Sequence, residues 1–446
     1  MSVAVALALL TFLLAAPIAS ARELFVTASG SPTGSCDRSD PCTPQQAINA
    51  EARGSDDVEI ASGTYTVTAP LVARDQVTVH GPAHGLRPTL VNDGSGSTTV
   101  PVGPNSGAIY SSRTLALRDQ ASARRLYVTQ TGTSAFTLEM ESNTSASDVV
   151  VVATGNGSWA VNVSGGATPL LRDVFAFAGG TGATAIHTYA DNLRLRNVLA
   201  IAPNYGGDAL DIVGWGCLQH AGCRGAVTAT VDARNVILRG ALADAVLLSD
   251  YAGARGVLNV DHSNFRSGRV LAPGGAGTGS LVDRGTNQSA DPLFVNSQVG
   301  DYRPAAGSPT IDNGVIDADV SGFDMDGNAR PLGGAADIGP FEYVAPPATP
   351  VSPPVSPPVS PPVAPGTGSG GVQAPPPASS STSTQSPPVF TPQVPTACRR
   401  LKAKARSTCI KREQALSACR KVKTTKRRAA CMKKAKRIGR TSARRT

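Results

Sequence analysis

The fold of this chain is decided by five short stretches that share an apolar centre: SAFTL (134–138), WAVNV (159–163), TAIHT (184–188), DALDI (208–212) and DAVLL (244–248). Their central residues recur at steps of 25, 25, 24 and 36 residues. Between them the chain alternates short strand-like segments with turns rich in Gly, Asn and Asp, and no helix-length apolar pattern intervenes. Such a period is typical of a solenoid, because each coil stacks its side chains on the next.

A second series keeps step with the first, each member an Asp or Asn followed by an apolar residue: Asp148, Asp173, Asn197, Asn235 and Asn264. Its steps are 25, 24, 38 and 29 residues, so both series lengthen in the same place. One insertion at 213–225 accounts for both. We therefore predict an all-β fold, a parallel β-helix (solenoid) in which equivalent residues lie over one another about 4.8 Å apart.

The front of this stack is predicted to be a cap. The strand-like LFVT (24–27) leads to a loop bounded by Cys36 and Cys42. A helix is expected at 43–50, with Thr43 as its N-cap and Pro44 at its first position. Such a cap protects the open end of the sheet from edge-to-edge pairing.

The repeats and this entry segment resemble the pectate-lyase-like right-handed parallel β-helix superfamily over most of residues 22–343. Several motifs follow one another at the end of this region: DPLFV (291–295), GDYRP (300–304), GSPTID (307–312), DGNARP (326–331) and DIGPFEY (337–343). Together they resemble the choice-of-anchor Q region, which in bacterial surface proteins follows a β-helix and precedes various anchoring tails. The resemblance implies a right-handed single-stranded β-helix and an exported protein, but no particular activity.

Four regions are expected along the chain: a signal peptide (1–21), the β-helix with its cap and its anchor-like end at about 291–343 (22–343), a disordered Pro/Ser/Thr-rich linker (344–397) and a short basic helical tail (398–446). The first region is an apolar run that ends in Ala19-Ser20-Ala21, a pattern typical of signal cleavage, although no Lys or Arg precedes the run. No later apolar run reaches the roughly 18–20 residues of a membrane span. We expect a secreted, extracellular protein associated with the cell envelope.

Eight cysteines suit an oxidising compartment. Cys36 and Cys42 lie six residues apart, as do Cys217 and Cys223, and each pair is predicted to form a local disulfide. The tail holds four more: Cys398, Cys409, Cys419 and Cys431. Their pairing is open between nested disulfides in a helical hairpin and disulfides between chains. We expect a monomer, with disulfide linkage through the tail as the alternative.

The net charge of +9 conceals a strong segregation. Residues 398–446 carry twenty Lys or Arg against one acid, Glu413, so the rest of the chain is net negative. Such a tail would bind wall polymers, anionic lipid headgroups or stray nucleic acid through a salt-sensitive, non-specific field. It lacks the aromatic residues that stack on bases, so no specific nucleic-acid partner is expected. We predict that a cell-wall polyanion retains the protein, with a solvated extension as the alternative.

Functional residues are sought on the outer face of the coils. We take the five central residues to point inward: Phe136, Val161, Ile186, Leu210 and Val246. His187 then lies one coil from Asp211 on the outer face, where a carboxylate can orient the imidazole for acid–base chemistry. The candidate catalytic residues are Asp208, Asp211, His187 and Arg224. The candidate substrate-binding residues are Glu139, Asn162, Tyr189, Trp215 and His220.

The pair Asp208 and Asp211 forms a D-x-x-D that resembles the Asp-containing coil of polygalacturonase-like β-helices. This chain departs from that pattern, since it lacks paired aspartates followed by Cys, a His-Gly and an Arg-x-Lys. Three interpretations stay open for the face: ordinary solvated residues of a repeat, a binding surface, and a catalytic site.

A second cluster of oxygen ligands lies near the end of the β-helix: Asp319, Asp324, Asp326 and Asn328. Closely spaced carboxylates suit a hard cation such as Ca²⁺, which takes six to eight oxygens. The glycine follows Asp326 directly, unlike an EF-hand loop. The alternative is that these residues cap turns. No other metal or cofactor is expected.

Two functions follow from these observations. The first is a non-enzymatic envelope protein whose β-helix presents a carbohydrate-binding or adhesive face. The second is a secreted polysaccharide lyase or glycoside hydrolase that acts on an acidic polysaccharide.

Overall fold

The computed structural model describes residues 21–94, 100–101, 109–110, 113–166, 168–216, 226–249, 252–272 and 279–346. Residues 1–20, the predicted tail and all but the first three residues of the predicted linker lie outside this range. Residues Phe294–Tyr302 cluster apart from the others and hold β24 (Phe294–Asn296) and the short helix η3 (Ser297–Val299). The paragraphs below concern the larger unit.

The larger unit is built from two long parallel sheets. Sheet A contains β1 (Glu23–Ser31), β2 (Asp57–Ile60), β3 (Thr64–Thr66), β5 (Thr78–His80), β6 (Thr89–Asn92), β10 (Ser122–Gln130), β12 (Ser145–Ala153), β14 (Leu170–Ala178), β16 (Leu193–Ala202), β18 (Ala226–Arg234), β19 (Ile237–Gly240), β21 (Arg255–Asp261) and β23 (Ser280–Asp283). Sheet B contains β4 (Leu71–Ala73), β9 (Arg113–Leu117), β11 (Phe136–Met140), β13 (Trp159–Val163), β15 (Thr184–Thr188), β17 (Asp208–Gly216), β20 (Ala245–Ser249) and β22 (Val270–Leu271).

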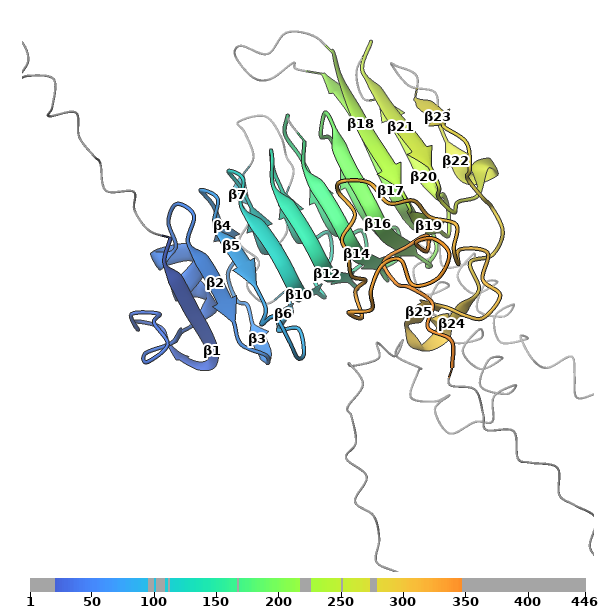
Figure 1. Cartoon of the computed structure of the whole chain (residues 1–446). Helices are drawn as coiled ribbons and strands as arrows, with labels where there is room; N and C mark the ends of the chain where they lie inside the picture. The colour runs from blue at the N-terminus through green and yellow to red at the C-terminus, as the bar shows by residue number, and fades with distance from the viewer. Residues whose placement is uncertain are drawn as a thin grey trace, which may run out of the picture. The chain divides into compact units, whose positions relative to one another are not determined.

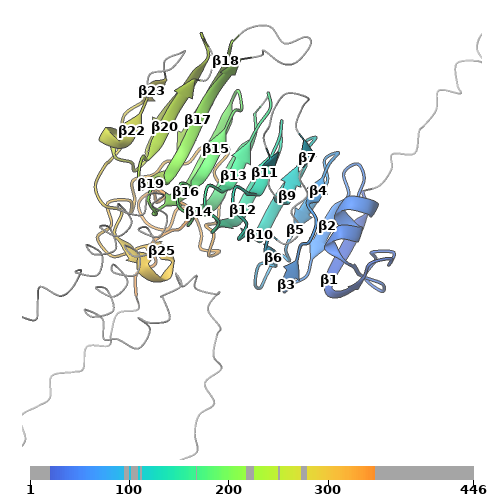
Figure 2. The same ribbon diagram turned by 180° about the vertical axis from the view of Figure 1, so that it is seen from behind.

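Successive strands alternate between the two sheets from β9 to β17, so that each coil there contributes a strand to both. The strands of sheet A follow one another from the blue N-terminal end to the yellow end in Figure 1. Figure 2 shows the molecule from behind, where the strands of sheet B can be followed. Smaller elements complete the set: the antiparallel pair β7 (Val100–Pro101) and β8 (Ile109–Tyr110), the short helix η2 (Ser267–Arg269) and β25 (Asp301–Pro304). The prediction of an all-β, right-handed parallel β-helix is confirmed.

The core is a set of aliphatic columns inside the coils. Leu138, Val161, Ile186 and Leu210 are neighbours in register on four consecutive strands of sheet B, and all four are fully buried. Each parallel strand therefore buries its apolar residue directly against the residue of the next coil.

Two of the five inward assignments made from the sequence are wrong. Phe136 pairs with Trp159, not Val161, and Val246 pairs with Asp211, so both lie on the outer face. The first error has a physical cause: strict alternation is broken in these strands, because Ala160 and Val161 both belong to the core. Two consecutive core residues shift every later side chain of the strand to the opposite face.

The strands of sheet A bend at one position in each coil. Arg125, Asp148, Asp173, Asn197 and Asn235 occupy this position, all with φ between +51° and +56°. Asp and Asn tolerate the left-handed region better than other non-glycine residues. The series of Asp and Asn residues found in the sequence therefore marks this bend from Asp148 to Asn235. Because the bend recurs once in each coil, the series has the same period as the apolar segments.

Side chains at this bend bond from coil to coil and to the chain's C-terminal segment. The Asn235 amide donates to Asn197 (2.8 Å) and to the Val315 carbonyl (2.7 Å). We call residues 310–343 the strap. It crosses the coils in front of β14 and β16 in Figure 1. Val315 and Gly339, near the two ends of the strap, both bond to Asn235, and between them the Met325 carbonyl accepts a hydrogen bond from Arg87.

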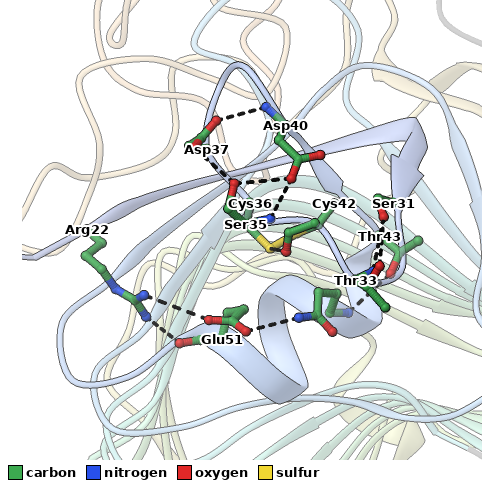
Figure 3. The surroundings of a disulfide bond; sticks show 12 residues. Arg22, Ser31, Thr33, Ser35, Cys36, Asp37, Asp40, Cys42, Thr43 and Glu51 are labelled. Atoms are coloured by element: carbon green, nitrogen blue, oxygen red, sulfur yellow. Dashed lines mark hydrogen bonds and ion pairs between the residues drawn. A yellow bond between two sulfur atoms is a disulfide. The ribbon is translucent and has the colours of Figure 1, made fainter.

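The N-terminal cap contains the predicted disulfide, Cys36–Cys42, whose cysteines are both fully buried. Figure 3 shows its surroundings, where Ser35, Asp37 and Asp40 hydrogen-bond to one another within the loop. Cys217 and Cys223 lie outside the described residues, so their pairing stays a prediction.

The expected cap helix is η1 (Gln45–Glu51), a π-helix shorter than predicted. The Thr43 hydroxyl accepts a hydrogen bond from the Gln46 amide at 3.2 Å, as an N-cap side chain would. Within the parts of the chain that the structure describes, no helix is long and apolar enough to cross a membrane.

Candidate functional site

The outer face of sheet B carries a column of polar residues on four consecutive strands. Glu139, Asn162, His187 and Asp211 are direct neighbours in register, and we call them the polar column. Each is at least nine-tenths buried. Glu139 lies directly beside Asn162. All four were named from the sequence, and the structure brings them together.

Aromatic rings lie alongside this column. The Phe136 and Trp159 rings stack with centroids 4.8 Å apart, and Trp159 stacks on the His187 ring at 4.2 Å with only 6° between their planes. Tyr189 meets the edge of His187, with centroids 4.7 Å apart. Both faces of Trp159 are therefore covered by neighbouring rings. The stack fixes the plane of the imidazole.

One acid, Asp211, meets His187 at one end of the column, and a second, Asp208, lies on the same strand beside Thr184. His187 Nδ1 lies 3.5 Å from Asp211 Oδ2, and the Thr184 hydroxyl donates to the same oxygen at 3.1 Å. Burial and, to a smaller extent, the nearby Asp211 carboxyl together raise the pKa of Asp208 to about 7. This end of the site therefore holds a carboxyl group that titrates near neutral pH.

Arginines neutralise the other end of the column. Arg113 lies 2.6 Å from the Glu139 carboxylate, and Arg118 lies 3.4 Å from Glu139 and 2.6 Å from Glu141. Burial raises the pKa of Glu139, and the two arginines oppose this rise. The charges here balance within the protein, because two guanidinium groups face two carboxylates.

Several polar atoms of this face are buried and have no hydrogen-bond partner among the residues that the structure describes: Asn162 Oδ1, His187 Nδ1, His187 Nε2, Asp208 Oδ1, Asp211 Oδ1 and Trp215 Nε1. Leaving such an atom unsatisfied costs about 1–3 kcal/mol, so they are rare in folded proteins. Their gathering on adjacent strands indicates a place where water or a polar ligand completes the hydrogen bonding.

The remaining predicted residues are distributed as follows. Trp215 lies further along β17 and is partly exposed, where it pairs with Val227 of β18 in an antiparallel arrangement. His220 and Arg224 lie outside the described residues, so their roles stay predictions. Sequence reasoning missed Arg113, Trp159 and Thr184. The signal for the last two was present, since Trp159, Thr184 and Asp208 hold the same position of successive repeats.

The four residues proposed as calcium ligands all belong to the strap, where Asp319 and Asp324 form an ion pair and turn hydrogen bonds, respectively. Asp319 pairs with Arg194 at 2.5 Å. Asp324 accepts hydrogen bonds from the amides of Asp326, Asn328 and Glu342 at 2.7–3.0 Å, as a residue that caps a turn does. Among the described residues, no group of three or more His, Cys, Asp or Glu side chains is placed to hold a metal ion. The arrangement favours turn formation and docking over metal binding.

No family model and no curated protein matches this chain. Solved structures do. Pectate lyase Pel9A is 13% identical, with 74% of this chain and 98% of that chain covered and a TM-score of 0.38. Pectin methylesterase PemA from Erwinia chrysanthemi is 12% identical, with 64% and 99% covered and a TM-score of 0.37. A rhamnogalacturonan lyase is 13% identical, with 68% and 97% covered and a TM-score of 0.31.

The substitution Asp208→Asn is expected to remove a pH dependence of stability. Because the pKa of Asp208 rises from 3.8 to about 7 on folding, the folded chain holds this proton more tightly than the unfolded chain. The resulting stabilisation is complete below pH 3.8 and is lost as the pH rises through about 7. The free energy of unfolding of the wild type should therefore fall more than that of the variant between about pH 5 and about pH 8.

Denaturant unfolding at the two pH values measures this difference. Asp283→Asn, which alters an exposed carboxylate on sheet A, is the matched control and should keep the wild-type pH dependence. If the free energy of unfolding of the wild type and of Asp208→Asn changed equally between the two pH values, the expectation would be contradicted.

Proposed function

We propose that this chain is an exported cell-envelope protein that binds carbohydrate through the outer face of sheet B. The observation that carries the proposal is the set of buried, unpartnered polar atoms along the polar column. A sugar hydroxyl both donates and accepts hydrogen bonds, so it suits the carbonyl and carboxyl oxygens of Asn162 and Asp211 as well as the ring nitrogens of His187. A polyhydroxylated ligand would satisfy these atoms together.

The repeat of the fold suits an extended ligand. Neighbouring strands place equivalent side chains about 4.8 Å apart, so a chain lying across the strands would meet similar groups at each coil. Trp159 and Tyr189 are partly exposed beside the column and offer apolar edges to the carbon skeleton of a sugar. These features favour an oligosaccharide or polysaccharide over a small solute.

The proposal extends to the ends of the chain. Residues 1–21 would direct export, 291–343 would form the choice-of-anchor-like end, and the basic residues of 398–446 would hold the protein at an envelope polyanion. Washing cells in rising salt tests the last point. A protein that stays bound at high salt would contradict electrostatic retention.

A specific observation favours an enzyme as the second candidate. His187 Nδ1 lies 3.5 Å from Asp211, and the pKa of the neighbouring Asp208 is about 7. A carboxyl group that titrates near neutral pH is what a general acid of a glycoside hydrolase or a lyase requires.

One experiment separates the two candidates. The full chain is incubated with a panel of neutral, amine-bearing and acidic polysaccharides, and both retention and chain cleavage are measured. Retention that Asp211→Asn weakens, without new reducing or unsaturated ends, supports the binding protein. New ends that disappear in Asp211→Asn, but persist in the control Asp283→Asn, support the enzyme. If the chain neither retains nor cleaves any of the polysaccharides, both candidates are rejected.

A further inference from the structure

The charges on the outer face of sheet B are unevenly paired. Its described carboxyl groups include those of Glu139, Glu141, Asp208 and Asp211. Arg113 and Arg118 are engaged by Glu139 and Glu141, and a third arginine, the exposed Arg74, follows directly on β4. Among the described residues, no arginine forms an ion pair with Asp208 or Asp211.

The excess acid lies at one place. Asp211 is about nine-tenths buried, and its bonded oxygen, Oδ2, faces only a hydroxyl and the imidazole. Its other oxygen, Oδ1, has no hydrogen-bond partner, and neither does Oδ1 of Asp208. Buried carboxylates are normally paired with a cation, because burial without a partner is costly. Among the described residues, no Lys or Arg pairs with the acids at this end of the face.

His187 gives independent support for a ligand here. Its side chain is nine-tenths buried, both ring nitrogens lack hydrogen-bond partners, and one of them lies 3.5 Å from Asp211. The stack with Trp159 holds the ring in this orientation. A donor group placed between His187 and Asp211 would satisfy atoms on both residues, and Asp208 lies on the same strand as Asp211. The described side chains are not arranged to hold a metal ion, so an organic cation fits better.

We propose that the carbohydrate bound by this face carries a protonated amine, as an amino sugar does, and that Asp208 and Asp211 receive the ammonium group. This inference rests on the proposed function and narrows its ligand class. An ammonium has three donors, which match the free oxygens of the two acids and the acceptor nitrogen of a neutral His187. The Tyr189 ring lies against His187 on the same face, and aromatic rings attract cations. The face would disfavour uronic acids, since their carboxylates would meet Asp208 and Asp211.

The test compares three oligosaccharides of equal length with the full chain: a glucosamine oligomer, its fully N-acetylated form and an oligogalacturonate. Affinity is measured by calorimetry at a salt concentration high enough to screen the basic tail. We expect the amine form to bind at least about ten-fold more tightly than the acetylated form, since hydrogen bonds to charged groups contribute about 1.5–3 kcal/mol. This comparison needs no variant and so does not depend on how variants fold.

Variants then locate the contact. Asp211→Asn should reduce affinity for the amine oligomer by about ten-fold or more and leave that for the acetylated form nearly unchanged. The control Asp283→Asn should change neither, and thermal unfolding verifies that all three proteins are folded. Equal affinity for the amine and acetylated forms overturns the amine inference but leaves carbohydrate binding standing. Uronate binding that depends on Asp211 also overturns it. If no oligosaccharide binds in a way that depends on sheet B, the proposed function is overturned as well.

Discussion

Replacing Arg330 by Ala is expected to lower the free energy of unfolding by about 3–5 kcal/mol, because two buried carboxylates lose their cation. The Arg330 side chain is fully buried and lies 2.5 Å from Asp173 and 2.8 Å from Glu342. Burial raises the pKa of Asp173, and Arg330 is the strongest influence that opposes the rise. The substitution should also release the strap, since Arg330 fixes it to the bend of β14.

Denaturant unfolding measures the stability loss, and limited proteolysis of residues 310–343 measures the release. Arg284→Ala is the matched control: Arg284 pairs with Asp232 at 3.1 Å, but its side chain is 40% exposed. An exposed pair contributes about 0–1 kcal/mol, so the control should stay close to the wild type. A loss for Arg330→Ala no larger than that of the control would contradict the role given to Arg330.

The substitution Ile186→Ala is expected to destabilise the chain by about 2–5 kcal/mol, because it opens a cavity in the aliphatic column. Ile186 is fully buried between Val161 and Leu210 on the adjacent strands. These neighbours belong to fixed coils and can close the space only in part. The shorter truncation Ile186→Val should cost about 0.5–1.5 kcal/mol, which gives an internal scale.

Equilibrium unfolding of both variants in denaturant checks this order. If Ile186→Ala and Ile186→Val lost the same small amount of stability, the column would not be a tightly packed core. Because Ile186 directly precedes His187, the fluorescence of Trp159, which stacks on His187, would report any displacement of the outer face.

The coil period could be predicted from the sequence, since a stacked fold repeats its apolar and turn residues. Asp148, Asp173, Asn197 and Asn235 were recognised because few other residues accept the left-handed bend that they occupy. The break in alternation at Ala160 could not be predicted, because alanine is compatible with either face of a strand. For that reason Phe136 was assigned to the core, where Leu138 is found.

The neighbourhood of His187 and Asp211 was predicted because a fixed period places equivalent residues on adjacent strands. The pairing of Arg113 with Glu139 was not, because Arg113 belongs to an earlier coil outside the recognised series. The position of the strap was not predictable either. Asp317 contacts Arg196 and Arg234, which lie 121 and 83 residues away, and no local pattern encodes such contacts.

The strap changes how this β-helix should come apart. In a solenoid each repeat touches only its two neighbours, so end coils can fray one at a time. Here a single segment reaches from Arg87 near the first coils to Asn235 many repeats later. Loss of one coil beneath it would therefore break contacts made with distant coils, and the stack should melt as one cooperative unit.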